Sequence, residues 1–209
     1  MNFEEAVKCY RCLLCKRHLD ELDNVMSIYI NYSKYPTPVT LQKLAEVCVI
    51  GDHQHRIPKR SKTSAVHRIE SNLPTILATT FVDFEDLYKQ VASIIGSFPR
   101  VGLLTVYDVS LRIGHLFHDP IYPQKYLYLN NGAMVGAKKL LGSRRLSSKE
   151  ELSKFFSYPE AMAVTGIGSL RALPNNLIED FFCVMKDYLE PGPRGLITDR
   201  DKIPTYLRM

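Results

Sequence analysis

The densest cluster of side chains that can move protons or hold a phosphate lies between residues 52 and 62. It comprises His53, His55, Arg56, Lys59, Arg60 and Lys62. Imidazole titrates near neutral pH, so either histidine is a candidate general acid or base. Lysine and arginine hold nucleic-acid phosphates through their charge. The same polar, proline-containing composition is typical of a solvated loop, so the cluster predicts either a nucleic-acid contact surface or only an exposed loop.

A second candidate site is the chain reversal between two helical patterns at residues 96–102. Gly102 lies at the expected start of the second helix, where the missing side chain lets another group approach the free backbone N–H donors. These donors and the helix dipole favour an anion, and phosphate is the expected one. The expected phosphate contacts are Arg100, Gly102 and Thr105. Apolar residues that can seat the reversal on a core are Val101, Leu104, Val109, Leu111 and Ile113.

The reversal reads Phe98-Pro99-Arg100-Val101-Gly102-Leu103-Leu104-Thr105, and an apolar helix follows it. This pattern resembles the helix-hairpin-helix element of the DNA glycosylase superfamily. In that family the hairpin reads Leu-Pro-Gly-Val-Gly-x-x-Thr, and its backbone amides hold a DNA phosphate. The resemblance covers residues 84–141. It implies a glycosylase-like helical fold and a nucleic-acid partner, DNA rather than RNA.

The chain departs from the family pattern at the positions that carry chemistry. Arg100 stands where the first hairpin glycine belongs, although arginine is itself a phosphate ligand. Leu104 stands where the lyase members carry their catalytic lysine. Downstream, where the family places its catalytic aspartate, Asp119 is the nearest acidic residue, and the neutral Asn130 cannot replace a carboxylate. The resemblance therefore implies a divergent member that lacks the catalytic aspartate and lysine.

Four potential metal ligands, Cys9, Cys12, Cys15 and His18, follow one another at intervals of three residues. Thiolates and imidazoles bind zinc, and thiolates hold iron–sulfur clusters. In an unbroken α-helix, each three-residue step turns through about 300° and rises about 4.5 Å, so the four side chains cannot meet at one ion. We therefore expect buried or half-buried thiols, no metal site and no cofactor.

Further basic and aromatic residues follow the reversal. A basic run over residues 138–145, which includes Lys138 and Lys139, would widen a contact face if it lies on the same side as the hairpin. A solvated face is the alternative. Exposed tyrosines would stack on bases, whereas buried ones would belong to the core. The tyrosines concerned are Tyr122, Tyr126 and Tyr128.

A second glycine pair, Gly166 and Gly168, predicts another tight turn. Pro174 follows six residues after Gly168 and breaks a helix that leaves the turn. We interpret the pair as an ordinary helix–helix turn, with a phosphate-binding turn as the alternative. The sequence contains no nucleophile elbow, phosphate loop, dinucleotide glycine pattern or His-Glu-x-x-His zinc site.

The bulk composition limits the class of protein. The chain has 209 residues, 45% of them hydrophobic, and a net charge of +5, which allow a sizeable core and an acidic partner. No apolar run approaches the ~20 residues that span a bilayer, and the N-terminus lacks the features of a secretory signal. Five cysteines without such a signal indicate free thiols, so we expect a cytoplasmic protein with no membrane partner.

Helical spacing dominates the chain, so the predicted fold class is mainly α, a single globular helical domain with a central helix-hairpin-helix. The domain covers residues 1–190, with the hairpin at 84–114, and residues 191–209 form an irregular C-terminal tail. The expected helices span residues 2–32, 40–49, 64–73, 74–80, 84–95, 102–114, 133–141, 148–156 and 175–189. Expected N-caps include Asp83, a Ser148–Glu151 capping box, and Asn175 or Asn176. Residues 126–129 have strand-like composition.

Three functions are compatible with this sequence. The first is non-catalytic binding of DNA through its backbone phosphates. The second is a nucleic-acid-processing enzyme of the base-excision type that uses Asp119, His53 or His55. The third is a protein-interaction module in which the hairpin is only structural. Salt-dependent binding separates the first two from the third, and base release or strand scission separates the second from the first.

Overall fold

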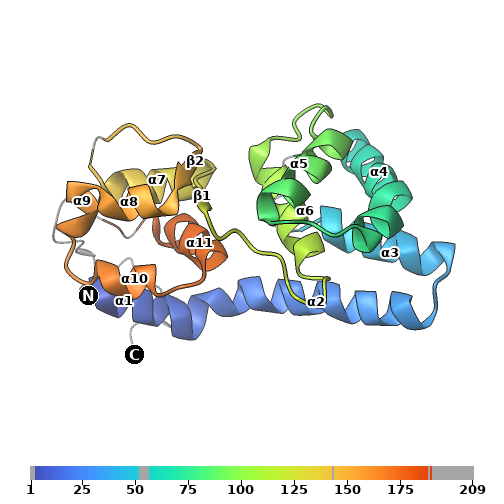
Figure 1. The fold of residues 1–209 in the computed structure, drawn as a ribbon, viewed down its shortest axis with the longest axis horizontal. Helices are drawn as coiled ribbons and strands as arrows, with labels where there is room; N and C mark the ends of the chain where they lie inside the picture. Colours follow the sequence, from blue (N-terminus) through green and yellow to red (C-terminus); the bar gives the residue numbers. More distant parts are fainter. Residues whose placement is uncertain (1–2, 52–56, 143, 188, 190–209) are drawn as a thin grey trace. The chain divides into compact units, whose positions relative to one another are not determined.

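The computed structural model describes residues 3–51, 57–142, 144–187 and 189, without the side chains of Leu13 and Leu14 (Figure 1). Helices and one two-stranded sheet make up this part of the chain, which confirms the mainly α prediction. His53, His55 and Arg56 lie outside the described residues. The chain divides into two compact units, a middle unit (Leu19–Tyr122) and a terminal unit (residues 1–18 and 123–209).

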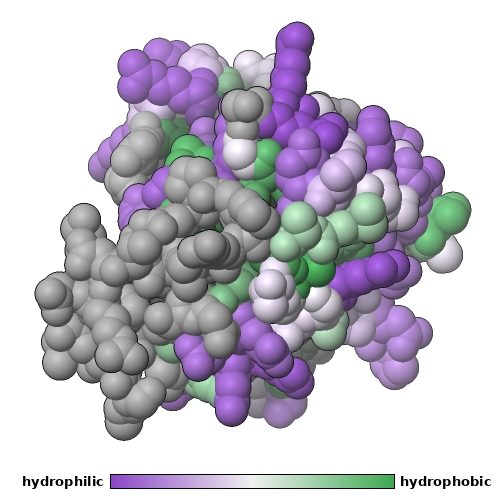
Figure 2. Space-filling view, turned by 90° about the vertical axis from the view of Figure 1, so that its left-hand side faces the viewer, coloured by the Kyte–Doolittle hydropathy of each residue, from purple (hydrophilic) through white to green (hydrophobic). Residues whose placement is uncertain are grey.

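Figure 2 shows one face, on which hydrophilic residues surround a smaller group of hydrophobic ones. Across the described ranges, every helix is too short or too polar to cross a membrane.

The N-terminal helix contains one irregular turn. It consists of α1 (Phe3–Cys9), the π-helix η1 (Tyr10–Leu14) and α2 (Cys15–Lys34). We expected an uninterrupted α-helix, and η1 corrects that prediction. The Cys15 N–H donates to the Tyr10 carbonyl, five residues away, and both side chains are buried. In a regular α-helix these two residues would be about 140° apart, so burying both requires the wider turn.

The middle unit contains four further helices, α3 (Pro38–Val49), α4 (Lys59–Ala78), α5 (Phe84–Ile95) and α6 (Leu103–Gly114). The Asp83 carboxylate accepts a hydrogen bond from the Asp86 N–H at 3.0 Å, which confirms the expected cap of α5. Before α3, the Thr37 hydroxyl accepts from the Thr40 N–H at 3.2 Å, so α3 begins two residues earlier than expected.

Helix α4 replaces three separate predictions. We expected a loop up to residue 62 and two helices divided at Pro74, but one helix begins at Lys59 and contains Pro74 in its interior. A proline inside a helix removes one backbone hydrogen bond. Leu73 and Ile76, on either side of it, are buried in the core, and their burial keeps the helix continuous.

The terminal unit combines α1 and η1 with the elements after residue 123. A short antiparallel sheet pairs β1 (Tyr126–Tyr128) with β2 (Lys149–Glu151), so that Tyr128 lies opposite Lys149. The remaining elements are α7 (Asn131–Leu140), α8 (Leu152–Ser157), α9 (Pro159–Met162), α10 (Ile167–Arg171) and α11 (Asn175–Met185).

Two expected caps of the terminal unit are wrong. Residues 149–151 form β2 rather than the first turn of a capped helix, because the Glu150 carboxylate accepts from the Ser147 N–H (2.6 Å) and the Tyr158 hydroxyl (3.2 Å). Helix α11 begins after Pro174 instead of an asparagine cap. Asn175 instead donates from its side-chain amide to the Gln124 carbonyl at 2.7 Å.

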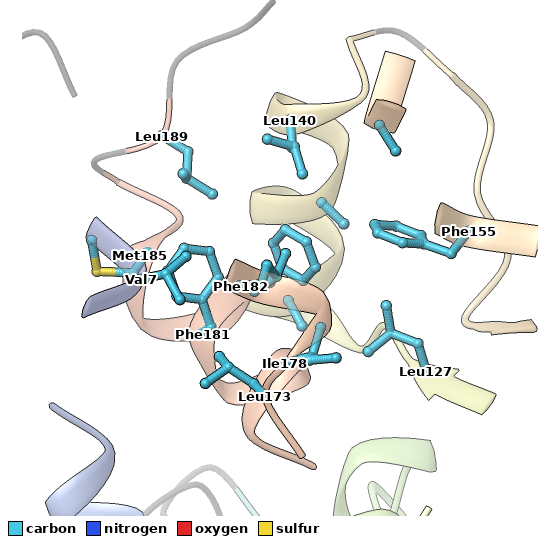
Figure 3. Packing of buried hydrophobic residues seen from close by; sticks show 14 of the residues in the cluster. Val7, Leu127, Leu140, Phe155, Leu173, Ile178, Phe181, Phe182, Met185 and Leu189 are labelled. Carbon is cyan, nitrogen blue, oxygen red and sulfur yellow. The ribbon is translucent and has the colours of Figure 1, made fainter. Parts of the chain in front are cut away.

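Leucines and other aliphatic residues form the core of the terminal unit together with several aromatic rings (Figure 3). Phe181 of α11 meets Tyr10 edge to face, with ring centroids 5.5 Å apart, and Phe155 of α8 meets Phe182 at 5.7 Å. The Tyr10 hydroxyl donates to the Asp180 carboxylate at 2.7 Å. This buried contact ties η1 to α11.

Aliphatic side chains dominate the core of the middle unit. They come from all five helices of that unit, and include Val25, Leu44, Ile69, Val91 and Val109. Arg112 of α6 is also buried, and it donates to the Cys48 carbonyl at 3.1 Å and pairs with Glu21 at 2.6 Å. Arg112 therefore holds α6 against α2 and the end of α3.

Candidate nucleic-acid interface

The reversal between α5 and α6 is a tight turn held by backbone hydrogen bonds. The Gly96 N–H donates to the Ala92 carbonyl at 2.8 Å and closes α5. The Val101 N–H then donates to the Phe98 carbonyl at 3.0 Å, so residues 98–101 form a four-residue turn with Pro99 in second place. Proline fixes the backbone angle that this position needs.

Arg100 adopts a left-handed backbone conformation, with φ at 61°. A left-handed third residue is typical of type II turns, where glycine or asparagine is favoured. For an arginine this conformation costs about 1–2 kcal/mol. The Arg100 side chain is exposed, and within the described part of the chain no hydrogen bond or ion pair involves it. The turn therefore exposes a guanidinium that no described residue pairs with, at an energetic cost.

The N-terminus of α6 is open beyond this turn. Gly102 occupies the cap position without a side-chain hydrogen bond, and a Cβ added there would meet nothing within 4 Å. The first backbone bond of the helix runs from the Val106 N–H to the Gly102 carbonyl at 3.2 Å. The first-turn amides of Leu103, Leu104 and Thr105 therefore lack a side-chain cap, and they are suited to an anion.

Side chains of the first turn of α6 differ in exposure. Thr105 is buried, so its backbone amide rather than its hydroxyl is the group suited to a ligand at this helix end. Leu103 is 55% exposed, and our sequence analysis gave it no role. An apolar residue beside free amides carries no signal in the sequence, because helix periodicity alone does not tell which first-turn side chain faces solvent.

Apolar residues seat the hairpin as expected. Val101, Val109 and Ile113 belong to the middle-unit core together with Ile95 at the end of α5. Leu104, which was expected to join them, is only half-buried. The hairpin is therefore held by its contacts with the middle-unit core, and Pro99 and Arg100 of its turn are exposed to solvent.

Two predicted basic contacts lie in the same unit as the hairpin. Lys59 and Arg60 occupy the first turn of α4, are exposed, and form no ion pair with any described residue. Cations at a helix N-terminus add to the positive end of the helix dipole, so this turn has a positive potential. Lys62, which was predicted to belong to the same basic cluster, is half-buried, whereas Lys59 and Arg60 are exposed.

The other predicted basic run belongs to the terminal unit. Lys138 and Lys139 lie in the last turn of α7, where cations complement the dipole. Arg144 is engaged within the protein. It donates to both carboxylate oxygens of Glu160 at 2.7–3.0 Å and stacks over the Tyr158 ring at 4.2 Å. The hydrogen bond from Arg144 lowers the pKa of Glu160. Arg144 therefore has a structural role.

The candidate catalytic residues are not gathered in a described cleft. Asp119 is fully exposed, and its carboxylate Oδ1 lies 3.4 Å from the Nδ1 of His118, which is also exposed. His53 and His55, either of which was expected to transfer protons, lie outside the described residues. Buried carboxylates of the described chain serve structural contacts instead, as with Asp180 and Tyr10.

The tyrosines after the hairpin contact the protein's own side chains. Tyr122 stacks on His115 and hydrogen-bonds to its ring nitrogen, and Tyr128 is buried. Tyr126 has the Lys149 ammonium 4.2 Å from its ring centroid. These rings fit the core alternative rather than a free stacking surface.

The remaining glycine pair and the thiols complete the set of predicted sites. Gly166 has φ at 87°, and a Cβ there would meet Glu4 at 2.9 Å, so the turn is closely packed at Gly166, whereas a Cβ at Gly168 would meet nothing within 4 Å. Helix α10, which follows it, has only five residues. Among Cys9, Cys12 and Cys15, the first is half-buried, the second exposed and the third buried. A search of the described residues finds no group of three side chains placed to hold a metal ion.

Comparison with protein-family models, with curated proteins and with solved structures gives no match for this chain.

Proposed function

We propose that this chain binds nucleic acid, DNA in preference to RNA, through a backbone phosphate at the α5–α6 hairpin. The observation that carries the proposal is Arg100, which is exposed, has no partner among the described residues and adopts a left-handed conformation two residues before Gly102, the N-cap of α6. Left-handed non-glycine residues concentrate at functional sites, where the strain is offset by what the side chain does.

The groups at the hairpin match the needs of a phosphate. The guanidinium supplies charge and paired N–H donors, and the amides that follow Gly102 supply uncharged donors at the positive end of a helix dipole. Open space at Gly102 lets a phosphate reach those amides. Lys59 and Arg60 would add further charge contacts from the same unit. Binding of this kind is independent of base sequence.

The test is fluorescence anisotropy with labelled double-stranded DNA, single-stranded DNA and RNA, at salt concentrations from about 50 to about 200 mM. We expect a steep loss of affinity with salt and an affinity at least about tenfold lower for Arg100→Glu. Lys43→Glu is the matched control, because Lys43 is an exposed lysine of α3 and its reversal changes the net charge equally.

Two results contradict the proposal. If the wild-type chain binds none of the probes at low salt, the hairpin is only structural. If Lys43→Glu weakens binding as much as Arg100→Glu does, the attraction follows net charge rather than the hairpin. Base release or strand scission that is lost in Asp119→Asn would instead support the processing-enzyme alternative.

A protein-interaction module is the second candidate, and one observation favours it. Tyr35 and Val39, on either side of the Thr37 cap between α2 and α3, are 64% and 75% exposed. Large exposed apolar side chains are typical of protein contacts when they lie together. Association with a protein that persists at high salt and is lost in Tyr35→Ser with Val39→Ser would support this function.

A further inference from the structure

Three thiols lie at three-residue intervals along the N-terminal helix. Cys9 and Cys15 have helical backbone angles, with φ and ψ of −61° and −48° and of −64° and −18°, and Cys12 lies in η1 between them. Residues three apart on such a helix have Cα atoms about 5–6 Å apart. Disulfide-bonded residues have Cα atoms about 4.4–6.8 Å apart, so Cys12 is within bridging distance of both neighbours.

Burial distinguishes the two possible partners of Cys12. Cys12 itself is exposed, so an external reagent reaches it first. Cys15 is buried, and its thiol donates to the Arg11 carbonyl at 2.8 Å. Cys9 is only half-buried, and the nearby Cys12 thiol contributes, after burial, to raising its pKa. Cys9 is therefore the more accessible partner.

The surroundings of Cys12 are cationic. Lys8, Arg11 and Lys16 lie within four residues of it and are exposed, and residues 6–19 include no aspartate or glutamate. Positively charged neighbours attract anionic reagents. Oxidised glutathione is an anionic disulfide of this kind.

We propose that Cys12 and Cys9 form a reversible dithiol site for low-molecular-weight disulfides of the glutathione class. The Cys12 thiolate attacks one sulfur of oxidised glutathione, which forms a mixed disulfide and releases one glutathione thiolate. Cys9 loses its proton to solvent and attacks the Cys12 sulfur, which forms the Cys9–Cys12 bond and releases the second glutathione. Two protein thiols are oxidised, and one glutathione disulfide is reduced to two thiols.

The position of the bridge makes it reversible and gives it a structural consequence. A bond between residues of one helix holds side chains that diverge from the helix axis, and strained disulfides are readily reduced. The bridge spans Tyr10, whose hydroxyl is bonded to Asp180 of α11. Oxidation therefore acts where the N-terminal helix is tied to the core of the terminal unit. This site is independent of the hairpin and of its proposed function.

The test uses the full-length chain treated with oxidised glutathione, quenched with an alkylating reagent, and analysed by intact mass and by tryptic peptides without reduction. Trypsin cleaves after Lys8, Arg11 and Lys16, so a Cys9–Cys12 bond joins two peptides, whereas a Cys12–Cys15 bond closes a loop within residues 12–16. We expect the joined peptides in wild type. Cys9→Ser should retain one glutathione on Cys12, Cys12→Ser should form neither product, and the matched control Cys15→Ser should behave as wild type.

Three outcomes would overturn the assignment. A loop within residues 12–16 of wild type would show that Cys15 is the partner. A glutathione adduct that persists on wild type as long as on Cys9→Ser would show that Cys9 does not react. The rate of bridge closure should still rise above pH 9, because burial raises the pKa of Cys9 from 9.0. A plateau at lower pH would exclude Cys9 as the attacking thiol.

Discussion

In the described chain, left-handed residues precede the helices α6 and α10, and the cap glycines of these two helices differ in what lies against them. Before α10, Gly166 packs so closely on Glu4 that a Cβ would come within 2.9 Å of that side chain. Before α6, the left-handed residue is Arg100, and a Cβ added at Gly102 would have nothing within 4 Å of it. The cap position of α10 is closed by the protein's own residues, although a Cβ at Gly168 would also meet nothing within 4 Å, whereas the cap position of α6 is open.

Charged side chains of the same two regions show the same contrast. In the terminal unit, Arg144 is held by Glu160 and by the Tyr158 ring. In the middle unit, Arg100 has no such partner among the described residues. Glycine content alone would favour the Gly166–Gly168 turn as a phosphate site. The α6 hairpin therefore differs from the Gly166–Gly168 turn in the space at its cap position and in an arginine with no partner among the described residues, rather than in glycine content.

Removing Arg112, which holds α6 against α2 and α3, should have the largest effect on the stability of the open hairpin. Arg112→Met leaves Glu21 and the Cys48 carbonyl without their buried partner, so we expect the free energy of unfolding to fall by about 3 kcal/mol. Binding at the hairpin should weaken as well, because α6 carries its amides. Urea denaturation measures the first effect. Lys89→Met is the control, since its exposed 3.5 Å pair with Asp86 contributes under about 0.5 kcal/mol. A change below about 1 kcal/mol for Arg112→Met would show that other contacts hold α6.

A methyl group at each turn should separate the closed turn from the open one. Gly166→Ala must hold alanine at φ 87° and displace Glu4, so we expect a loss of about 2 kcal/mol in unfolding free energy. Gly102→Ala enters open space at φ −95° and should cost about 0.5 kcal/mol as a poorer cap. Denaturation of both variants under one set of conditions tests the difference. Equal losses would mean that the two turns are packed alike.

The sequence predicted what depends on local signals. The periodicity of α5 and α6, the Asp83 cap and the turn around Pro99 are all set by neighbouring residues, and they were found. The π turn was missed because it requires Tyr10 and Cys15 to be buried together, which is a tertiary demand. The continuity of α4 through Pro74 depends in the same way on its burial in the core.

Only part of the candidate site could be predicted from the sequence, because the rest depends on tertiary contacts. Arg100 and Gly102 stand in a recognisable local pattern. The open space at Gly102 depends on the tertiary structure, because no other segment of the described chain packs against this glycine. Gly166 is closed by Glu4, which comes from the other end of the chain. Arg144 is unavailable to a ligand because it pairs with Glu160 of α9. Contacts of this kind leave no trace in spacing or composition.

Replacing Arg100 with glycine should sharpen the contrast between stability and binding. Arg100→Gly relieves about 1–2 kcal/mol of left-handed strain against about 0.5–1 kcal/mol of added chain entropy, so the variant should be more stable by about 0.5 kcal/mol. It should also bind DNA several-fold more weakly, with a salt slope lower by about 0.9. Arg100→Lys keeps the charge and the strain and is the matched control. Lower stability in Arg100→Gly would mean that the arginine makes a stabilising contact.

The smallest effect concerns the closed region and depends on pH. The hydrogen bond from Arg144 lowers the pKa of Glu160 below its ordinary value of 4.5. A lowered pKa in the folded state means that the pair contributes stability above pH 4.5 and loses it as the pH falls through the folded-state pKa. Glu160→Gln removes the charge and leaves Arg144 on the Tyr158 ring. Its melting temperature should therefore be slightly below that of wild type at pH 7, and the difference should disappear once the pH is below the folded-state pKa of Glu160. A difference that persists in acid would show that the carboxylate acts through packing rather than charge, and Arg144 would then differ less from the unpaired Arg100 than the geometry indicates.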